Sequence, residues 1–255
     1  MKQITISIIT VVYNGEELLE GTIQSILNQT YPNIEYIIVD GQSKDGTMSI
    51  INKYADKISH WISEADRGLY DAMNKSLDLA TGDFVWFMNA GDHVFASNTI
   101  EKMVAQYTVE TDILYGEVML VDDARKHIGT RSKLTTQKLP NQLNFKSLQK
   151  GMVVCHQGFL PRRSIAKKYL LDNLAADIDW VLKCLEQSRK NTNTHLILSE
   201  YLQGGVSKQQ HQQSLKDRYQ VLKKHYGFLP NLWNHFWIIL RGIWFKISHF
   251  RKDSY

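Results

Sequence analysis

The chain has 255 residues, of which 43% are apolar and 22% are charged, a globular composition that excludes collagen, coiled coil and disorder. Its two cysteines are too few for a disulfide framework or a four-cysteine zinc site, which favours a reducing compartment. No stretch reaches the roughly 18 uninterrupted apolar residues of a membrane span. The short apolar run at 4–12 is rich in β-branched residues and predicts a strand, not a signal peptide.

The net charge of +4 is unevenly distributed along the chain. Residues 205–255 carry nine Lys or Arg against two Asp or Glu, whereas the rest of the chain holds 21 against 24. Three of the six tryptophans also lie in this basic segment. The sequence therefore predicts a mildly acidic body over residues 1–207 and a basic, aromatic tail over residues 208–255.

The first half of the chain alternates apolar strands with helical patterns. Strands are expected at 4–12, 35–39, 60–63 and 84–88, and helices at 16–29, 47–57 and 69–80. Later segments predict two strands at 112–115 and 117–121, a helix at 176–187 and a last strand at 196–202. Strands that alternate with helices in this way predict an α/β fold with a mostly parallel central sheet flanked by helices.

Polar and glycine-containing segments follow the first four expected strands. They are Tyr13–Gly15, Asp40–Gly46, Glu64–Gly68 and Asn89–Asp92. Parallel α/β sheets bind their ligands at the carboxyl ends of the strands, so these segments are expected to converge on one site. Asp and Gly are also common in turns and helix caps, which is the alternative for each segment taken alone.

These segments lack the usual phosphate-binding motifs. No G-x-G-x-x-G follows the first strand, and neither G-x-x-x-x-G-K-[ST] nor G-x-S-x-G occurs in the chain. Nicotinamide dehydrogenases, P-loop kinases and α/β-hydrolases are therefore disfavoured. A sheet edge with carboxylates suits a base or ribose, through Asp40, and a hard divalent cation, through Asp92.

The same residues resemble family 2 glycosyltransferases of the GT-A fold. The resemblance is closest to bacterial enzymes that build lipopolysaccharide O-antigen, capsule or colanic-acid-type exopolysaccharide. It rests on five segments in the same order, and it is strong over residues 4–95 and thinner to about residue 207. The segments are ISIITVVYN at 6–14, VDGQSKDGT at 39–47, SEADRGLYDAMNK at 63–75, ATGD at 80–83 and NAGD at 89–92.

The resemblance implies an inverting transferase that uses a nucleotide-diphosphate sugar, UDP-linked by preference. The transferred hexosyl or N-acetylhexosaminyl group would go to a lipid-linked or growing surface-polysaccharide acceptor. By the same resemblance, the nucleotide would be contacted by Val11, Tyr13, Asp40 and Asp66.

The resemblance also places the family's DXD metal motif at Asn89–Asp92. Asp92 and Asn89 would hold Mg²⁺ or Mn²⁺ there. However, Asn89 stands at the place of the usual first acid, and Gly91 at the place of the third-position acid. These two departures put the metal dependence in doubt.

The segment at 176–180, ADIDW, resembles the Glu-Asp-x-Asp segment that opens a helix in the family. Asp177 then takes the position of the catalytic base, which removes the proton from the acceptor hydroxyl as it attacks the anomeric carbon. The alternative is that Asp177 caps the helix or interacts with its positive end.

Two weaker resemblances concern the acceptor side and the donor loop. His156 and Gln157 are similar to a His-Gln pair that faces the acceptor, although a lone histidine is more often structural. The segment that ends at Ser207, GGVS, resembles a loop that folds over the donor, and its glycines would permit the movement. An ordinary connector is the alternative for this loop.

The tail has the pattern of an amphipathic helix. Its apolar residues between 232 and 250, except Ile238 and Phe245, fall on one side, and Asn231, Asn234, His235 and Arg241 fall on the other. Aromatic residues with cationic edges are typical of a helix that lies in a membrane interface. Further attraction to anionic lipid is expected from Lys216, Arg218, Lys223 and Lys224.

The chain is accordingly expected to be a peripheral protein on the cytoplasmic face of the cell membrane. The alternative is a tail helix packed on its own domain or on a second subunit. No nucleic-acid partner is expected, since no recognised binding module accompanies the basic tail.

Two other functions remain as alternatives. A non-catalytic assembly partner of a membrane glycan-synthesis complex is favoured by Asn89 and Gly91 and disfavoured by Asp177 and Asp92. A nucleotidyltransferase would need a basic glycine-rich loop after the first strand, which the segment at 13–17 does not provide.

Overall fold

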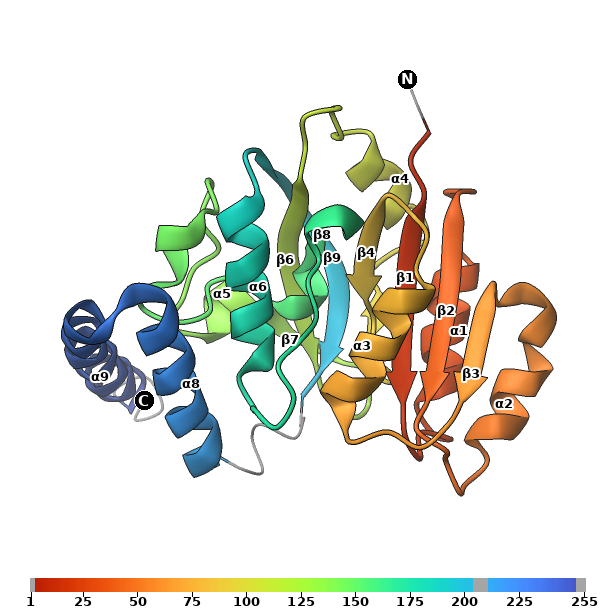
Figure 1. The fold of residues 1–255 in the computed structure, drawn as a ribbon, viewed down its shortest axis with the longest axis horizontal. Helices are drawn as coiled ribbons and strands as arrows, with labels where there is room; N and C mark the ends of the chain where they lie inside the picture. The colour runs from red at the N-terminus through yellow and green to blue at the C-terminus, as the bar shows by residue number, and fades with distance from the viewer. Residues whose placement is uncertain (1–2, 204–210, 251–255) are drawn as a thin grey trace.

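The computed structural model describes residues 3–203 and 211–250. Its first sheet has four parallel strands in the order β3-β2-β1-β4 (Figure 1). These strands are β1 (Ile6–Val12), β2 (Ile34–Asp40), β3 (His60–Ser63) and β4 (Phe84–Phe87). All four strands were expected from the sequence, and the parallel arrangement is confirmed.

Helices connect the strands and cover both faces of this sheet. They are α1 (Leu19–Leu27), α2 (Thr47–Lys53), the 3-10 turn η1 (Ala55–Lys57), α3 (Leu69–Leu79) and α4 (Thr99–Val104). Alternate residues of β1 face opposite layers, so that Ile9 packs in the cluster with α3 and Ile8 packs in the cluster with α1. Because both faces are buried, the strand is a continuous apolar run.

A second sheet, with strand order β5-β9-β6-β7, continues the fold, and β8 pairs with β6. Its strands are β5 (His93–Val94), β6 (Ile113–Val121), β7 (His127–Thr130), β8 (Phe159–Pro161) and β9 (Asn191–Leu202). An antiparallel bridge between Phe84 and Arg162 joins the two sheets. Strands β6 and β9 pair in parallel, whereas β5 and β9, β6 and β7, and β6 and β8 pair antiparallel. A short turn joins β6 to β7, as is usual for an antiparallel pair.

The two strands expected at 112–115 and 117–121 form one strand, β6. Gly116 lies in its middle, where a Cβ would come within 2.7 Å of the Leu196 carbonyl oxygen in β9. The glycine therefore marks the close approach of a neighbouring backbone, not the end of a strand. The prediction of two strands was wrong for this reason.

Along the chain, the remaining elements of the body lie between the strands of the second sheet. They are α5 (Arg131–Leu134), η2 (Phe145–Leu148), η3 (His156–Gly158), η4 (Arg163–Ile165) and α6 (Ala176–Gln187). Helix α6 has the bounds expected from the sequence, and it buries Trp180 and Cys184 in the core.

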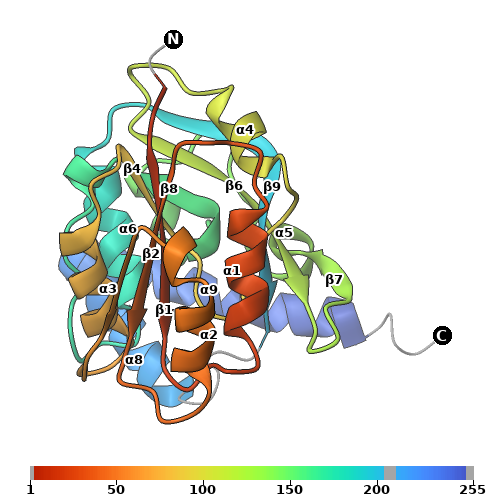
Figure 2. The ribbon, with the colours of Figure 1, turned by 90° about the vertical axis from the view of Figure 1, so that its right-hand side faces the viewer.

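Two further helices form the tail, α8 (His211–Tyr226) and α9 (Phe228–Phe250). In Figure 1 they lie beyond α6, at the end of the molecule opposite α2 and β3. Figure 2 shows α9 extending past the edge of the body toward the C-terminus. Within residues 3–203 and 211–250, no helix combines the length and the apolar character that crossing a membrane requires.

Candidate functional site

The carboxyl ends of β1, β2 and β3 lie side by side. In the register of the sheet, Val12 pairs with Asp40, and Asp40 pairs with Ser63. The Gly41 N–H extends this alignment by donating to the Val12 carbonyl oxygen at 2.9 Å. The segments that follow the first three strands therefore meet at one sheet edge, as the sequence predicts.

Asp40 is fully buried at this edge and is held by hydroxyl and amide donors. The Ser63 hydroxyl donates to Oδ2 at 2.6 Å, and the Ser43 N–H donates to the same oxygen at 3.1 Å. The Ser43 hydroxyl donates to Oδ1. These bonds fix the carboxylate as an acceptor. Sequence reasoning missed the roles of Ser43 and Ser63, although both lie inside the segments that carry the family resemblance.

Tyr13 and Asp66 flank the same backbone turn. A Cβ on Gly41 would come within 2.5 Å of Asp66 Oδ2 and 3.4 Å of the Tyr13 ring. The Tyr13 side chain is 63% exposed, so its ring is open to stacking by a flat ligand. Val11 is buried, and its carbonyl oxygen accepts from the Ala90 N–H at 3.5 Å. The structure thus brings Tyr13, Asp40 and Asp66 together, with Val11 behind them.

A small pocket of about 170 Å³ adjoins this edge and is lined by residues 14–18 and Asp45. Two hydrogen bonds of 2.8 Å join its walls, from the Asn14 N–H to the Ser43 hydroxyl and from the Lys44 N–H to Asn14 Oδ1. Asn14 has a φ of 48°, a left-handed conformation that asparagine adopts more readily than most residues. The loops after β1 and β2 are therefore locked together beside Asp40.

Asp92 lies next to the second sheet and is only 4% exposed. Gln157 Nε2 donates to its Oδ2 at 2.9 Å, and the Leu202 N–H donates to its Oδ1 at 3.2 Å. Burial raises the pKa of Asp92 to about 7, although these hydrogen bonds and the charge of Arg125 act in the opposite direction. Two residues that the sequence singled out separately, Asp92 and Gln157, are therefore in direct contact.

The surroundings of Asp92 fit a divalent cation only in part. Oδ1 of Asn89 is buried and has no hydrogen-bond partner among the described residues, so it is an available oxygen ligand. At Gly91, with a φ of 100°, any side chain would be strained and would meet leucine side chains, so a carboxylate does not fit there. The Arg125 guanidinium also donates to the Gly91 carbonyl oxygen at 2.5 Å.

The described part of the chain holds no cluster of metal-ligating side chains. In the part of the chain that the structure describes, no group of three or more His, Cys, Asp or Glu side chains could hold a metal ion. Of the described side chains, Asp92 and Asn89 would hold a cation at this position, with phosphate and water as further ligands.

Asp177 lies in the first turn of α6 and does not cap it. The N-cap residue is Ala175, whereas Asp177 Oδ1 accepts from the N–H of the next residue, Ile178, at 2.8 Å. Burial raises the pKa of Asp177, and the charges of Arg218 and Arg131 offset part of this effect. Asp177 is thus a desolvated carboxylate with few donors, which suits the uptake of a proton.

Asp92 and Asp177 both lie within electrostatic range of Cys155 and of Tyr201, and we call the region around these four residues the central site. Burial raises the pKa of Cys155 to about 11 and also raises that of Tyr201, and the charges of both aspartates add to each shift. Sequence reasoning missed Tyr201, which lies near the end of β9 and carries no motif.

His156 lies in the core. It is 8% exposed, its ring packs against Phe87 and Trp180, and its Nε2 is 2.7 Å from the Tyr169 hydroxyl oxygen. Burial lowers the pKa of His156 to about 4, so it is neutral at pH 7. This placement matches the structural alternative for His156. Ser207 and its loop lie outside the described residues.

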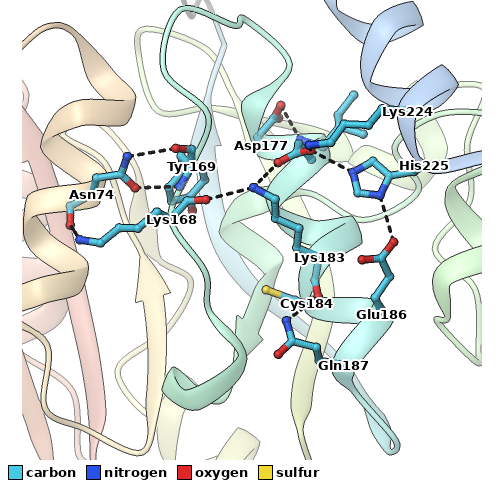
Figure 3. A network of polar contacts seen from close by, with 12 residues as sticks. Asn74, Lys168, Tyr169, Asp177, Lys183, Cys184, Glu186, Gln187, Lys224 and His225 are labelled. Atoms are coloured by element: carbon cyan, nitrogen blue, oxygen red, sulfur yellow. Dashed lines mark hydrogen bonds and ion pairs between the residues drawn. The ribbon is translucent and has the colours of Figure 1, made fainter.

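Asp179, two residues after Asp177, faces α8. Lys183 Nζ lies 2.6 Å from its Oδ2, and Lys224 Nζ and His225 Nε2 lie 3.0 and 2.9 Å from its Oδ1. Burial alone would raise its pKa, but hydrogen bonds from these three residues hold the pKa of Asp179 well below its usual range. Figure 3 shows Lys224 and His225 reaching α6, with Glu186 on the other side of the His225 ring.

Helix α9 packs against α8 through its polar side. Asn231 and Asn234 are buried, Asn231 Nδ2 donates to the Tyr219 carbonyl oxygen at 3.2 Å, and the rings of Tyr219 and His235 are 4.8 Å apart. The apolar side is turned outward. The described apolar side chains of α9 that are more than half exposed are Phe228, Leu229, Leu232, Trp233, Phe236, Ile239, Ile243 and Trp244.

This arrangement corrects one expectation about the tail. Arg218 and Lys224 were both expected to attract lipid, but Lys224 is ion-paired with Asp179, and Arg218 is half-buried within electrostatic range of Asp177. Lys216 and Lys223 remain exposed. The helical pattern could not distinguish them, because it does not show which side of α8 meets the body.

Sequence comparison gives the family. The family model described as "Glycosyl transferase family 2" matches residues 7–170. A PGL/p-HBAD biosynthesis glycosyltransferase of Mycobacterium bovis is 29% identical over 213 residues, which cover 79% of this chain and 78% of the relative.

Solved structures give the same fold. A structure of S. aureus TarS 1–349 in complex with UDP-GlcNAc matches with a TM-score of 0.69 at 17% identity, over 87% of this chain but only 65% of the TarS fragment. The mannosyltransferase PcManGT from Pyrobaculum calidifontis, in complex with GDP-Man and Mn²⁺, matches with a TM-score of 0.66 at 18% identity, over 94% of this chain and 74% of its own. At these identities the likeness shows the fold alone. Together with the family match, it shows that the chain belongs to glycosyl transferase family 2, the nucleotide-sugar-dependent glycosyltransferases, with a GT-A-like fold.

Proposed function

We propose that the chain is an inverting transferase that moves a hexosyl or N-acetylhexosaminyl group from a UDP-sugar to a hydroxyl of a lipid-linked or growing surface polysaccharide, such as an O-antigen. One observation carries the proposal: two carboxylates whose pKa values burial raises, Asp177 and Asp92, both lie within electrostatic range of Cys155 and Tyr201. The nucleotide part draws support from the TarS and PcManGT structures, which hold UDP-GlcNAc and GDP-Man.

The nucleoside would bind at the edge formed by β1, β2 and β3. Asp40 would accept hydrogen bonds from the base or ribose, because its carboxylate is already held in place by Ser43 and Ser63. Tyr13, with its exposed ring, would stack on the base, and Asp66 would add a second polar contact beside it.

In the proposed transfer, Asp177 acts as the general base. Its carboxylate takes the proton from the acceptor hydroxyl while that oxygen forms a bond to the anomeric carbon. The bond between that carbon and the diphosphate oxygen breaks on the opposite side, so the configuration inverts. General-base catalysis contributes about 10²–10⁴ in rate, and the raised pKa of Asp177 strengthens its affinity for the proton.

Asn89 and Asp92 are the proposed protein ligands of a Mg²⁺ or Mn²⁺ ion. A bound cation would supply positive charge to the departing nucleoside diphosphate. The PcManGT complex contains Mn²⁺, which supports this proposal. Since this chain offers one carboxylate and one amide oxygen, we expect a weakly held ion.

The tail, residues 208–255, is proposed to hold the protein at the cytoplasmic face of a membrane. Because α9 turns its polar side to α8, its tryptophans and aliphatic side chains are left for lipid. The exposed Lys216 and Lys223 on α8 add attraction to anionic headgroups.

Flotation with vesicles tests the membrane proposal. Vesicles of phosphatidylcholine with phosphatidylglycerol should bind the protein, and the double variant Trp233→Glu with Ile243→Glu should lose that binding about tenfold or more. Val109→Glu, at an exposed apolar position on the body, is the matched control. Unchanged vesicle binding by the double variant, or a shift of that variant from dimer to monomer, would favour a second subunit as the occupant of α9.

Calorimetric titration with UDP and GDP, each with Mn²⁺ or with EDTA, tests the function. We expect UDP to bind, and Mn²⁺ to increase its affinity. Binding of neither nucleotide under any condition would favour the alternative, a non-catalytic assembly partner of a glycan-synthesis complex, for which Asn89 and Gly91 are the supporting residues.

A further inference from the structure

Arg218 on α8 is a half-buried cation whose charge no described group pairs with directly. It makes no hydrogen bond or ion pair within residues 3–203 and 211–250, and its Nε atom is buried without an acceptor. A buried donor that lacks an acceptor destabilises the fold unless a ligand or water provides one. The residue therefore requires an explanation beyond packing.

The tail holds Arg218 next to the central site from two directions. Its neighbour Asp217 accepts from the Leu174 N–H at 2.8 Å, three residues before Asp177. Further along α8, Lys224 and His225 are bonded to Asp179 of α6 (Figure 3). Helix α8 is thus attached to the segment that carries Asp177 both before and after that residue.

Arg218 lies within electrostatic range of Asp177. Burial raises the pKa of Asp177, and the charge of Arg218 is one of the effects that oppose this. Among the described residues, the two do not form an ion pair, so the Arg218 guanidinium keeps its hydrogen-bonding capacity for another anion.

The other two arginines near the central site each donate to a backbone carbonyl oxygen, although Nη1 of Arg125 is buried without a partner among the described residues. Arg131 donates to the carbonyl oxygens of Val153 and Met152 at 3.1 and 2.5 Å. Arg125 donates to the Gly91 carbonyl oxygen at 2.5 Å. Arg218 differs from both in that no backbone carbonyl oxygen of the described residues accepts from it.

The chemistry at this position calls for a cation. A sugar that leaves a nucleotide donor leaves a diphosphate behind, and negative charge grows on its terminal phosphate as the bond breaks. Asn89 and Gly91 reduce the carboxylates that could hold a metal ion, so that charge needs another counterpart. A guanidinium stays protonated, and its planar fork matches two phosphate oxygens.

We propose that Arg218 binds the β-phosphate of the donor nucleotide and provides, from the tail, positive charge that the altered metal motif does not. This inference rests on the proposed transferase function. It makes the tail a part of the donor site in addition to a membrane-binding segment.

Calorimetry on the full chain tests this inference with UDP and UMP, in EDTA and again in Mn²⁺. Arg218→Gln is expected to weaken UDP binding about tenfold, the size of one charge-assisted contact, and to leave UMP binding nearly unchanged. The loss should be larger in EDTA than in Mn²⁺. Arg218→Lys should retain part of the affinity, because it keeps the charge without the fork.

Lys216→Gln is the matched control, since it removes a positive charge from an exposed position on the same helix. It should leave both affinities unchanged. Unchanged UDP affinity in Arg218→Gln would overturn the inference, and so would equal losses for UDP and UMP, which indicate a disturbed nucleoside edge. If Arg218→Gln does not fold, an Arg218→Lys variant with full UDP affinity and full UMP affinity overturns it as well. Failure of the unaltered protein to bind either nucleotide would instead contradict the proposed transferase function.

Discussion

Helix α6 presents two aspartates to two different regions of the molecule, and the regions hold them in opposite ways. Asp177 faces the central site, accepts from the Ile178 N–H, and has a pKa that burial raises. Asp179 faces the tail, is fully buried, and pairs with three groups that lower its pKa overall. The same type of side chain thus has a raised pKa in one region and a lowered pKa in the other.

The surroundings of each aspartate, and not the residue type, set its pKa. On a helix, side chains two residues apart are rotated by about 200° about the helix axis and so point to nearly opposite sides. Asp177 and Asp179 therefore lie in different environments. Cations within ion-pair distance decide the outcome at Asp179, whereas Arg218 and Arg131 influence Asp177 only through their charge.

The largest expected effect comes from removing the proton acceptor. Asp177→Asn should lower kcat by about 10²–10⁴, because the general base is lost, and should leave UDP affinity unchanged. UDP release from a UDP-sugar in the presence of a lipid-linked glycan extract measures the rate. Asp123→Asn, on an exposed turn, is the control. Turnover close to normal in Asp177→Asn would remove this residue from the mechanism.

Asp179→Asn should lower the stability of the fold, in contrast to Asp177→Asn, which should lower the rate. Loss of this buried anion is expected to lower the free energy of unfolding by about 3 kcal/mol, since Lys183, Lys224 and His225 lose their partner. Urea denaturation measures this. Asp78→Asn, whose side chain is 71% exposed and paired with Lys168, should cost under about 1 kcal/mol.

The pH dependence of the free energy of unfolding should also report the ion pairs of Asp179. The folded pKa of Asp179 lies below the ordinary value of 3.8, so its stabilisation is present above that value and is lost as the pH falls through the folded pKa. The acid sensitivity of Asp179→Asn should be correspondingly smaller. Equal acid sensitivity of the two proteins would contradict the ion-pair assignment.

Asp40 is a third carboxylate, and hydroxyl and amide donors hold it, whereas cations hold Asp179. Asp40→Asn should weaken UDP affinity about tenfold, because both the nucleoside contact and the bonds from Ser43 and Ser63 are disturbed. Calorimetry measures it, with the exposed Asp56→Asn as the control. Unchanged affinity would show that the nucleotide does not contact this edge.

The smallest effect concerns the pH profile of kcat/KM. A base acts only when deprotonated, so the rate should fall as the pH drops through the pKa of Asp177, and this acid limb should lie above the ordinary value of 3.8. Arg218→Gln removes a charge that favours the deprotonated form, so it should move the limb to still higher pH. An acid limb at the same pH in Arg218→Gln as in the unaltered protein would contradict an electrostatic effect of Arg218 on Asp177.

The sequence predicted those parts of the site that depend on local pattern. The buried strands and the residues after them place Asp40 and Asp66 at one edge, because parallel strands in register align their carboxyl ends. The helix that carries Asp177 was predicted with its observed bounds. Both predictions need only the order of elements along the chain.

Contacts between distant segments could not be predicted in this way. Asp92 accepts hydrogen bonds from Gln157 and from Leu202, and no pattern in the sequence links these positions. Helical periodicity likewise divides α9 into two sides, but it does not tell which side meets the body. The packing of α8 decides that question, and it turns Arg218 inward as well.

The hydrogen bond between Asp92 and Leu202 spans 110 residues, and this separation has a consequence for a chain that is still being made. Proteins emerge from the ribosome N-terminus first, and early segments can fold before later ones exist. The strands that carry Asp40 and Asp66 are complete within the first third of synthesis, so a nascent chain should acquire its nucleoside edge early. Asp92 obtains its partner Leu202, and the donor site the arginine that we propose for it, only after most of the chain has emerged. An unfinished chain is therefore expected to form the edge of β1, β2 and β3 before the surroundings of Asp92 are complete.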